Sequence, residues 1–265
     1  MSEVKKQISE LMAAARKKKL PPSEIIVAET FKKLGFLAEN TGPEIVQRDF
    51  NRMLKEVWLE TLCVLEDYEG KVYPSNIMDG LLALRSDVVE ESKKISQRDS
   101  YVQAVKFLFC SLYPYFREIF LSISQSRKTR GGRDFELQFG RLLQLMDVPY
   151  QKIKRKYRVD FMIPSDDLFR RNPTAAIIAS AKRTLRERWR EVVEELHEMR
   201  SPNIFLVTAD HDVSDGHIKA ICGHYRIHLV VWDEVKNKHS DEPLVLSYTQ
   251  WANERIPILR QFWAS

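Results

Sequence analysis

The chain has 265 residues, of which 44% are hydrophobic and 30% charged, so it can form one large domain or two smaller ones. The net charge of +5 is a mild basic bias, which is compatible with a polyanionic partner but does not establish one. No run of about 18 apolar residues occurs, and residues 1–20 lack the apolar centre of a signal peptide. We therefore expect neither a membrane span nor a membrane partner.

The three cysteines, Cys63, Cys110 and Cys222, lie far apart and form no cluster with zinc-binding spacing. A sparse and odd set of cysteines favours free, buried thiols in a reducing compartment. The cysteines therefore predict a cytoplasmic protein.

The first half of the chain is predicted to be mainly helical. Apolar residues recur at helical spacing in four segments, namely 1–20, 22–37, 43–68 and 100–124. Breaks are expected where turn-forming residues gather, at Gly42–Pro43, Glu69–Pro74 and Asp99–Ser100.

The pattern changes at Ser126, where a basic, glycine-containing stretch leads into an amphipathic helix. After a basic connector at 150–157, buried strands alternate with helices, with a polar loop expected at 164–173. Strands are predicted at 158–163, 175–179, 203–208 and 225–232, and helices after the second strand to about residue 200, at 216–222 and near the end of the chain. This alternation is typical of an α/β domain with a mixed sheet.

One lysine and three acids lie around these strands. Asp160 is within the first strand, and Lys182 follows the buried strand 175–179. Glu195 lies on the next helix and Glu136 on the helix before. A lone lysine at a strand end is more often an ordinary residue, but carboxylates that hold Mg²⁺ beside a lysine form the group that phosphodiester hydrolysis needs.

The order of acid, strand, Ser-x-Lys and distal glutamate resembles the PD-(D/E)xK nuclease superfamily. It is most similar to the type II restriction endonucleases of the EcoRII (C-terminal domain), SsoII and PspGI group. That group carries a glutamate on the following helix in place of the usual acid two residues before the lysine, where this chain has Ser180. The resemblance covers about residues 126–232 and includes the segment KRTLRERWRE, 182–191.

The resemblance implies roles for the four residues. Asp160, Glu195 and Glu136 would be metal ligands, and Lys182 would be the catalytic lysine. Glu194 is the alternative to Glu195 if the register differs by one residue. The implied cofactor is Mg²⁺, with one or two ions in each site and Mn²⁺ as an expected substitute.

The same resemblance assigns Arg186, Glu187 and Arg188 to base recognition in double-stranded DNA. Arginine can donate two hydrogen bonds to guanine, and a carboxylate can accept one from cytosine, so the triplet suits consecutive G·C pairs. The implied site is a palindrome with CC and GG half-sites, CCNGG or CCWGG, bound by a homodimer. The alternative without a DNA role is that these three residues form a solvent-exposed helix face with ion pairs.

Some relatives in this group extrude the central base of the site into a protein pocket. Such a base needs an aromatic platform. The candidates in this chain are Trp58 with Arg52, or Tyr73.

We therefore expect an α/β protein with a PD-(D/E)xK restriction-endonuclease-like core at 121–265, in which helices flank a mixed sheet. Residues 1–120 would form a helical region that packs on this core and serves DNA contact or dimerisation. A cognate DNA methyltransferase would be a functional partner. Two alternatives stay open: a repair or mobile-element nuclease of low specificity, and a non-catalytic DNA-binding protein.

Overall fold

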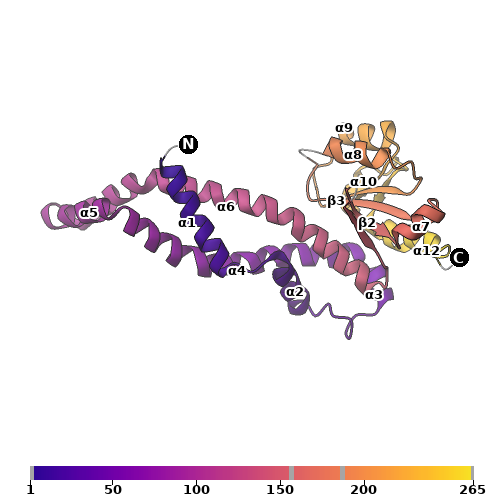
Figure 1. Ribbon diagram of the computed structural model, residues 1–265, viewed down its shortest axis with the longest axis horizontal. Helices are drawn as coiled ribbons and strands as arrows, with labels where there is room; N and C mark the ends of the chain where they lie inside the picture. Colours follow the sequence, from indigo (N-terminus) through magenta and orange to yellow (C-terminus); the bar gives the residue numbers. More distant parts are fainter. Residues whose placement is uncertain (1–2, 155–157, 186–188, 264–265) are drawn as a thin grey trace. The chain divides into compact units, whose positions relative to one another are not determined.

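The computed structural model describes residues 3–154, 158–185 and 189–263 (Figure 1). The chain divides into two compact units. Unit 1 contains residues 1–26 and 62–130, and unit 2 contains residues 27–61 and 131–265. This division differs from a single boundary near residue 120, because residues 27–61 group with the C-terminal part of the chain.

Unit 1 is helical, as the periodicity predicts. It contains α1 (Glu3–Lys19), α5 (Ser86–Arg98) and parts of α2 (Ser23–Lys33), α4 (Phe50–Leu84) and α6 (Tyr101–Leu145). Its core joins apolar residues of four of these helices: Ile8 and Met12 of α1, Leu81 of α4, Val88 of α5, and Leu112 and Ile119 of α6. No helix in the described part of the chain is long and apolar enough to cross a membrane.

One predicted break in the helices is wrong, and the predicted change of pattern at Ser126 is not a break. α4 continues through Gly70 and Pro74, and α6 continues through the basic, glycine-containing stretch after Ser126 and also contains Pro114. Burial of Val72 and Ile77 on both sides of Pro74 shows why, since tertiary packing stabilises the helix beyond local propensity. The other two expected breaks are confirmed, because α3 (Pro43–Arg48) begins at Pro43 and α6 begins after Ser100.

Unit 2 is built on one six-stranded mixed sheet whose strands lie in sequence order. The strands are β1 (Gln151–Lys154), β2 (Arg158–Ile163), β3 (Ile177–Lys182), β4 (Ile204–Thr208), β5 (His228–Val231) and β6 (Val245–Ser247). β1, β2 and β3 pair antiparallel, and β3 to β6 pair parallel. The predicted α/β fold with a mixed sheet is confirmed.

Helices cover this sheet and complete its core. The C-terminal part of α6 packs Phe135, Phe139 and Leu142 into the same cluster as the central strands. α8 (Trp189–His197) and α9 (Asp215–Ile218) lie side by side in Figure 1, and the rings of Trp189 and His217 meet edge to face at 5.6 Å between centroids. Unit 2 also contains α3 and parts of α2 and α4. Its further helical elements are α7 (Asp166–Arg171), a π-helix (Lys219–His224), α10 (Asp233–Lys238), α11 (Tyr248–Gln250), a π-helix (Trp251–Arg255) and α12 (Ile256–Arg260).

Four details of the predicted C-terminal half need correction. The basic connector contains strand β1, and the predicted polar loop contains α7, which Ser165 caps by accepting a hydrogen bond from the Leu168 N–H at 3.2 Å. β6 lies where a helix and an apolar tail were expected. Residues 183–185 after β3 are not helical.

The cysteines are free, but only one of them is buried. Cys222 is buried, whereas Cys63 and Cys110 are exposed on α4 and α6. Burial raises the pKa of the Cys222 thiol to about 12.

Candidate active site

Asp160 and Lys182 meet where β2 and β3 pair, at the carboxyl end of β3. Lys182 Nζ lies 3.6 Å from Asp160 Oδ2, and the two side chains keep 31% and 19% of their surface exposed. Asp160 Oδ2 also accepts a hydrogen bond from the Ala181 N–H at 2.9 Å. The carboxylate is therefore held in place by the backbone while the ammonium group still reaches solvent.

Strand register explains this contact. β2 and β3 pair with Phe161 opposite Ala179, so the preceding residue, Asp160, falls next to Ser180 and Ala181. Val159 and Phe161 on either side of Asp160 are buried on one face of the sheet, and Asp160 points to the opposite face, since successive side chains of a strand alternate. The polar pair thus interrupts an otherwise apolar pair of strands.

Ser180 and Ala181 supply further oxygen atoms near Lys182. Lys182 Nζ donates a hydrogen bond to the Ala181 carbonyl at 3.2 Å. Ser180 is only 1% exposed, and its hydroxyl has no hydrogen-bond partner among the described residues. The Ala181 carbonyl was not singled out from the sequence, because a backbone oxygen leaves no trace in residue type.

Glu136 lies on α6 and is paired with a lysine of the edge strand β1. Its carboxylate pairs with Lys152 of β1 at 3.1 Å and is 27% exposed. Lys152 Nζ in turn lies 5.8 Å from the ring centroid of Phe161. Glu136 is therefore one strand away from the predicted site, with its charge already balanced.

Glu194 and Glu195 point in different directions from α8. Trp189, Val193 and Leu196 form the buried side of this helix. Glu194 accepts a hydrogen bond from the Tyr225 hydroxyl at 3.3 Å, while Glu195 is exposed and has no partner within the part of the chain that the structure describes. Consecutive helical residues are about 100° apart, so only one of the two can face a given site.

The predicted carboxylates are not gathered into one cluster. Among residues 3–154, 158–185 and 189–263, no three His, Cys, Asp or Glu side chains lie close enough to hold a metal ion. The structure brings Asp160 to Lys182, and Asp160, Glu136 and Glu195 do not form a group of three that could hold a metal ion. Glu136 is paired with Lys152. Glu195 lies on α8, and residues 186–188, which directly precede this helix, are outside the described residues.

Arg186, Glu187 and Arg188, the predicted base-reading triplet, lie outside the described residues. Their neighbours in the chain are both buried: Leu185 is 0% exposed and Trp189 is 8% exposed. Asp210, which follows β4 and is buried beside Leu185, was not identified from the sequence. A carboxylate at the carboxyl end of a buried parallel strand was the available signal for it.

The two aromatic candidates for base stacking differ in burial. Trp58 is half-buried in unit 2, with its ring centroid 5.9 Å from His211 and 6.3 Å from Trp232. Tyr73 is 7% exposed within the core of unit 1, and burial raises its pKa. Arg52 is exposed but already paired, at 2.8 Å with Asp49 and 2.9 Å with Glu56.

Comparison with known proteins identifies relatives. Residues 94–247 match the family described as EcoRII C terminal. The type II restriction enzyme SsoII from Shigella sonnei is 30% identical over 143 residues, which cover 49% of this chain and 46% of that enzyme. The match thus spans about half the length of the curated relative.

Solved structures of two restriction enzymes are similar in fold. A structure of metal-depleted Ecl18kI with uncleaved, modified DNA matches with a TM-score of 0.78 and 23% identity, over 98% of this chain and 85% of that chain. A complex of the restriction endonuclease PspGI with substrate DNA matches with a TM-score of 0.61 and 19% identity, over 91% and 94%. Together with a family match over more than half of its length, the mixed sheet and the Asp160–Lys182 pair show that the chain belongs to the EcoRII C-terminal family.

Proposed function

We propose that this chain is a type II restriction endonuclease that hydrolyses double-stranded DNA at a short specific site. Membership of the EcoRII C-terminal family supports this class, and the relative SsoII is named as a type II restriction enzyme. The matched Ecl18kI and PspGI structures contain DNA. The observation that carries the proposed chemistry is the 3.6 Å approach of Lys182 Nζ to Asp160 Oδ2 at the carboxyl end of β3, where both side chains are partly exposed.

The oxygen atoms at the carboxyl end of β3 fit a divalent cation. Asp160 Oδ2 and the Ala181 carbonyl both lie within 3.6 Å of the Lys182 ammonium group, so two hard oxygen donors already surround a positive charge. Mg²⁺ prefers such donors, and Mn²⁺ accepts them. A bound ion would lower the pKa of water and neutralise charge on the phosphate.

Two further ligands are proposed on the sequence pattern. Glu195 would approach from α8 and would complete the carboxylate set in place of the acid that Ser180 replaces. Glu136 would serve a second ion only after releasing Lys152, and its present ion pair at 3.1 Å makes it the weaker candidate. Both assignments depend on groups moving when metal and DNA bind.

Lys182 is proposed to act on the reacting phosphate. Its ammonium group can donate hydrogen bonds to the attacking water or to a phosphate oxygen as negative charge develops. Water would attack phosphorus in line, and the bond to the 3′ oxygen would break. The products would be a 5′-phosphate and a 3′-hydroxyl.

Specificity is proposed to lie in Arg186, Glu187 and Arg188. Each bidentate arginine–guanine contact contributes about 1–3 kcal/mol of discrimination, and glutamate can accept from cytosine. A CC or GG half-site in each copy would give CCNGG or CCWGG when two copies bind a palindrome as a homodimer. A methyltransferase of the same specificity would then be needed to protect the host DNA.

If the central base is extruded, we propose Trp58 as its platform. Trp58 is the partly accessible aromatic candidate, whereas the ring of Tyr73 is buried in a core. Arg52 is not proposed to cover the extruded base, because Asp49 and Glu56 already pair with its guanidinium group. Fluorescence of 2-aminopurine at the central position would rise on binding if the base leaves the stack, and Trp58→Ala would reduce that rise.

Digestion of a plasmid of known sequence with Mg²⁺, followed by sequencing of the fragment ends, tests the proposed function. Discrete fragments that share one palindrome support a restriction endonuclease and give the cut position. A smear without a shared sequence would instead favour a nuclease of low specificity. Binding without cleavage over a wide range of metal and salt would favour a non-catalytic DNA-binding protein.

A further inference from the structure

The side chain of Arg183 lies against the backbone of α6 at Gly131. A Cβ on Gly131 would clash with Nη1 of Arg183 and would lie 3.0 Å from its Cζ and 3.1 Å from its Cδ. The guanidinium group therefore occupies the space that any other residue at position 131 would fill. A Cβ on the neighbouring Gly132 would meet nothing within 4 Å, so only the first glycine of this pair forms a notch for the arginine.

Strand geometry explains why Arg183 turns towards α6. Residues directly opposite each other in a sheet share a face, and Phe161 is paired with Ala179. α6 covers this face, because the rings of Phe139 and Phe161 are 5.1 Å apart. Alternation along β3 then places residue 183, which directly follows the strand, on the side of α6, and Lys182 on the opposite side.

Arg183 has no acidic partner in the described part of the chain. Its side chain is half-buried, and its guanidinium group makes no hydrogen bond or ion pair with a described residue. Packing against α6 restricts this long side chain, which lowers the entropy that a ligand would have to remove. The N–H donors of a positioned guanidinium group thus remain available for an acceptor outside the chain.

The place of Arg183 in the chain favours a phosphate as that acceptor. It directly follows Lys182, the proposed catalytic lysine, and shortly precedes the proposed base-reading residues 186–188. Arginine can bind a phosphate through two parallel hydrogen bonds. A cation between a catalytic lysine and a base-reading segment is therefore suited to contact the DNA backbone near the reacting phosphate.

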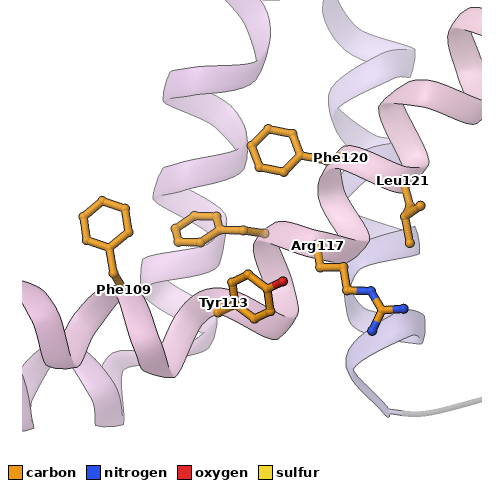
Figure 2. Close-up of a pocket in the computed structure, with 6 residues that line it drawn as sticks. Phe109, Tyr113, Arg117, Phe120 and Leu121 are labelled. Atoms are coloured by element: carbon orange, nitrogen blue, oxygen red, sulfur yellow. The ribbon is translucent and has the colours of Figure 1, made fainter.

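α6 carries an exposed arginine of its own, Arg117, but its surroundings do not favour a phosphate. Figure 2 shows Arg117 next to aromatic side chains of unit 1. The groove there has a volume of about 630 Å³ and is lined by Phe109, Tyr113, Phe116, Arg117, Phe120 and Leu121. A phosphate in this groove would lose its hydration against apolar side chains, with one guanidinium group in return.

We propose that Arg183, held in the notch at Gly131, binds a backbone phosphate of double-stranded DNA next to the phosphate that reacts. This inference rests on the proposed function only in taking DNA as the ligand. Contacts to phosphates fix the register and orientation of a protein on the duplex, whereas base contacts carry the sequence information. Arg183 thereby holds the duplex in position for Lys182 and does not itself read the sequence.

The salt dependence of DNA binding tests this contact. One duplex of about 30 base pairs carries CCAGG, which satisfies both CCNGG and CCWGG, and a second has the same composition without that site. Fluorescence anisotropy in Ca²⁺ gives the affinity between about 50 and 200 mM KCl. We expect Arg183→Ala to weaken binding of both duplexes at least about tenfold at the lowest salt, and to lower the slope of log K against log salt by about 0.9 for each bound copy. Arg141→Ala is the matched control, since Arg141 is an exposed arginine on α6 that contacts Gln144.

Alanine at the two glycines tests the notch itself. Gly131→Ala should displace the guanidinium group and weaken binding as Arg183→Ala does, whereas Gly132→Ala should not. In the Arg183→Ala chain, Gly131→Ala should have no further effect, because the side chain that it displaces is already gone. Circular dichroism would verify that each variant is folded.

An unchanged salt slope in Arg183→Ala would overturn the proposal, and so would a changed ratio of the two affinities at an unchanged slope. Equal weakening by Gly131→Ala with and without Arg183 would exclude the notch. Plasmid digestion separates this contact from the proposed function. Site-specific cleavage by the wild type with an unchanged slope in Arg183→Ala would contradict only the phosphate contact, whereas a reduced slope without any cleavage would support the contact and contradict the nuclease.

Discussion

The backbone N–H of Leu185 donates a hydrogen bond to Oδ2 of Asp210 at 2.8 Å. The other oxygen of this carboxylate, Oδ1, accepts from the N–H of Asp212 at 3.1 Å, and Asp210 is only 7% exposed. Asp210 thus ties the residue that directly precedes the Arg-Glu-Arg triplet to the loop after β4. Leu185, the residue before the proposed base-reading residues, is therefore held by the side chain of Asp210, which need not contact DNA itself.

Replacing Asp210 should change specificity more than it changes folding. Asp210→Ala leaves the Leu185 N–H without its acceptor, and we expect a loss of unfolding free energy of about 1–3 kcal/mol. Cleavage of the preferred site should fall relative to sites that differ by one base pair. Asp212→Ala is the control, since Asp212 is exposed in the same loop and takes part through its backbone N–H. Equal discrimination by both variants would show that Asp210 has no positioning role.

Alanine substitution of the two neighbouring glutamates decides the register on α8. Glu195→Ala should reduce cleavage by about a hundredfold or more at saturating Mg²⁺, because a proposed metal ligand is lost. Glu194→Ala should leave cleavage near the wild-type rate and change stability by no more than about 1 kcal/mol, since it removes only an exposed hydrogen bond to Tyr225. The reverse order would identify Glu194 as the ligand.

Removal of the Lys182 ammonium group should separate cleavage from binding. In Lys182→Ala we expect single-turnover cleavage to fall by about 10² to 10³, because a charge that stabilises the transition state is lost. Affinity for the uncleaved site in Ca²⁺ should stay within about tenfold of wild type, since one contact is removed from a large interface. Lys219→Ala is the control, since Lys219 is an exposed lysine in the π-helix that follows α9. Retained cleavage in Lys182→Ala would remove the proposed mechanism.

The buried strands could be predicted because their sequences are unambiguous. β2, β3, β4 and β5 are apolar runs bounded by turns, and each was expected at nearly its observed position. β1 could not be predicted, because its sequence QKIK is short and basic and gains its conformation from pairing with β2. The same limit explains the continuous helix α4, in which packing on both sides of Pro74 outweighs the local preference for a break.

The candidate site could also be predicted only in part. Asp160 and Lys182 were expected together because they lie on neighbouring buried strands, and their contact at 3.6 Å agrees with this. The partner of Glu136 could not be foreseen, because Lys152 lies on the strand that the sequence did not reveal. Asp210 was also missed, since its role is to accept backbone N–H groups, and these look alike in every sequence.

Titration of Cys222 should appear in the alkaline stability of the protein. Burial raises the folded-state pKa of this thiol to about 12, above its ordinary value of 9.0. The folded state therefore holds the proton more tightly, and stability is full below about pH 9 and is lost as pH rises towards 12. The loss approaches about 1.4 kcal/mol for each pH unit within that window.

Comparison with Cys222→Ala isolates this contribution, because other groups titrate in both proteins. Urea unfolding at pH 8 and pH 10 should show the wild type losing about 1 kcal/mol more than Cys222→Ala between the two values. An equal loss in both proteins would mean that burial does not raise the pKa of the Cys222 thiol in the folded state.

Two glycines of α6 should respond in opposite ways to alanine. A Cβ on Gly140 would lie 2.5 Å from the Tyr150 hydroxyl and 3.2 Å from Cε1 of Phe161, the residue next to Asp160, whereas a Cβ on Gly132 would meet nothing within 4 Å. Gly140→Ala should therefore cost about 1–3 kcal/mol through overpacking. Gly132→Ala should instead add about 0.5–1 kcal/mol, since alanine restricts the unfolded chain and favours the helix.

Urea unfolding of both variants measures this contrast, and cleavage of the two proteins extends it to the site. Because the ring of Phe161, the residue next to Asp160, must give way to the new Cβ, Gly140→Ala should also slow cleavage under conditions where it remains folded. Equal stability of the two variants would indicate that Tyr150 moves aside freely. In that case α6 would not fix the position of β2, and the geometry of Asp160 would have to depend on its pairing with β3 alone.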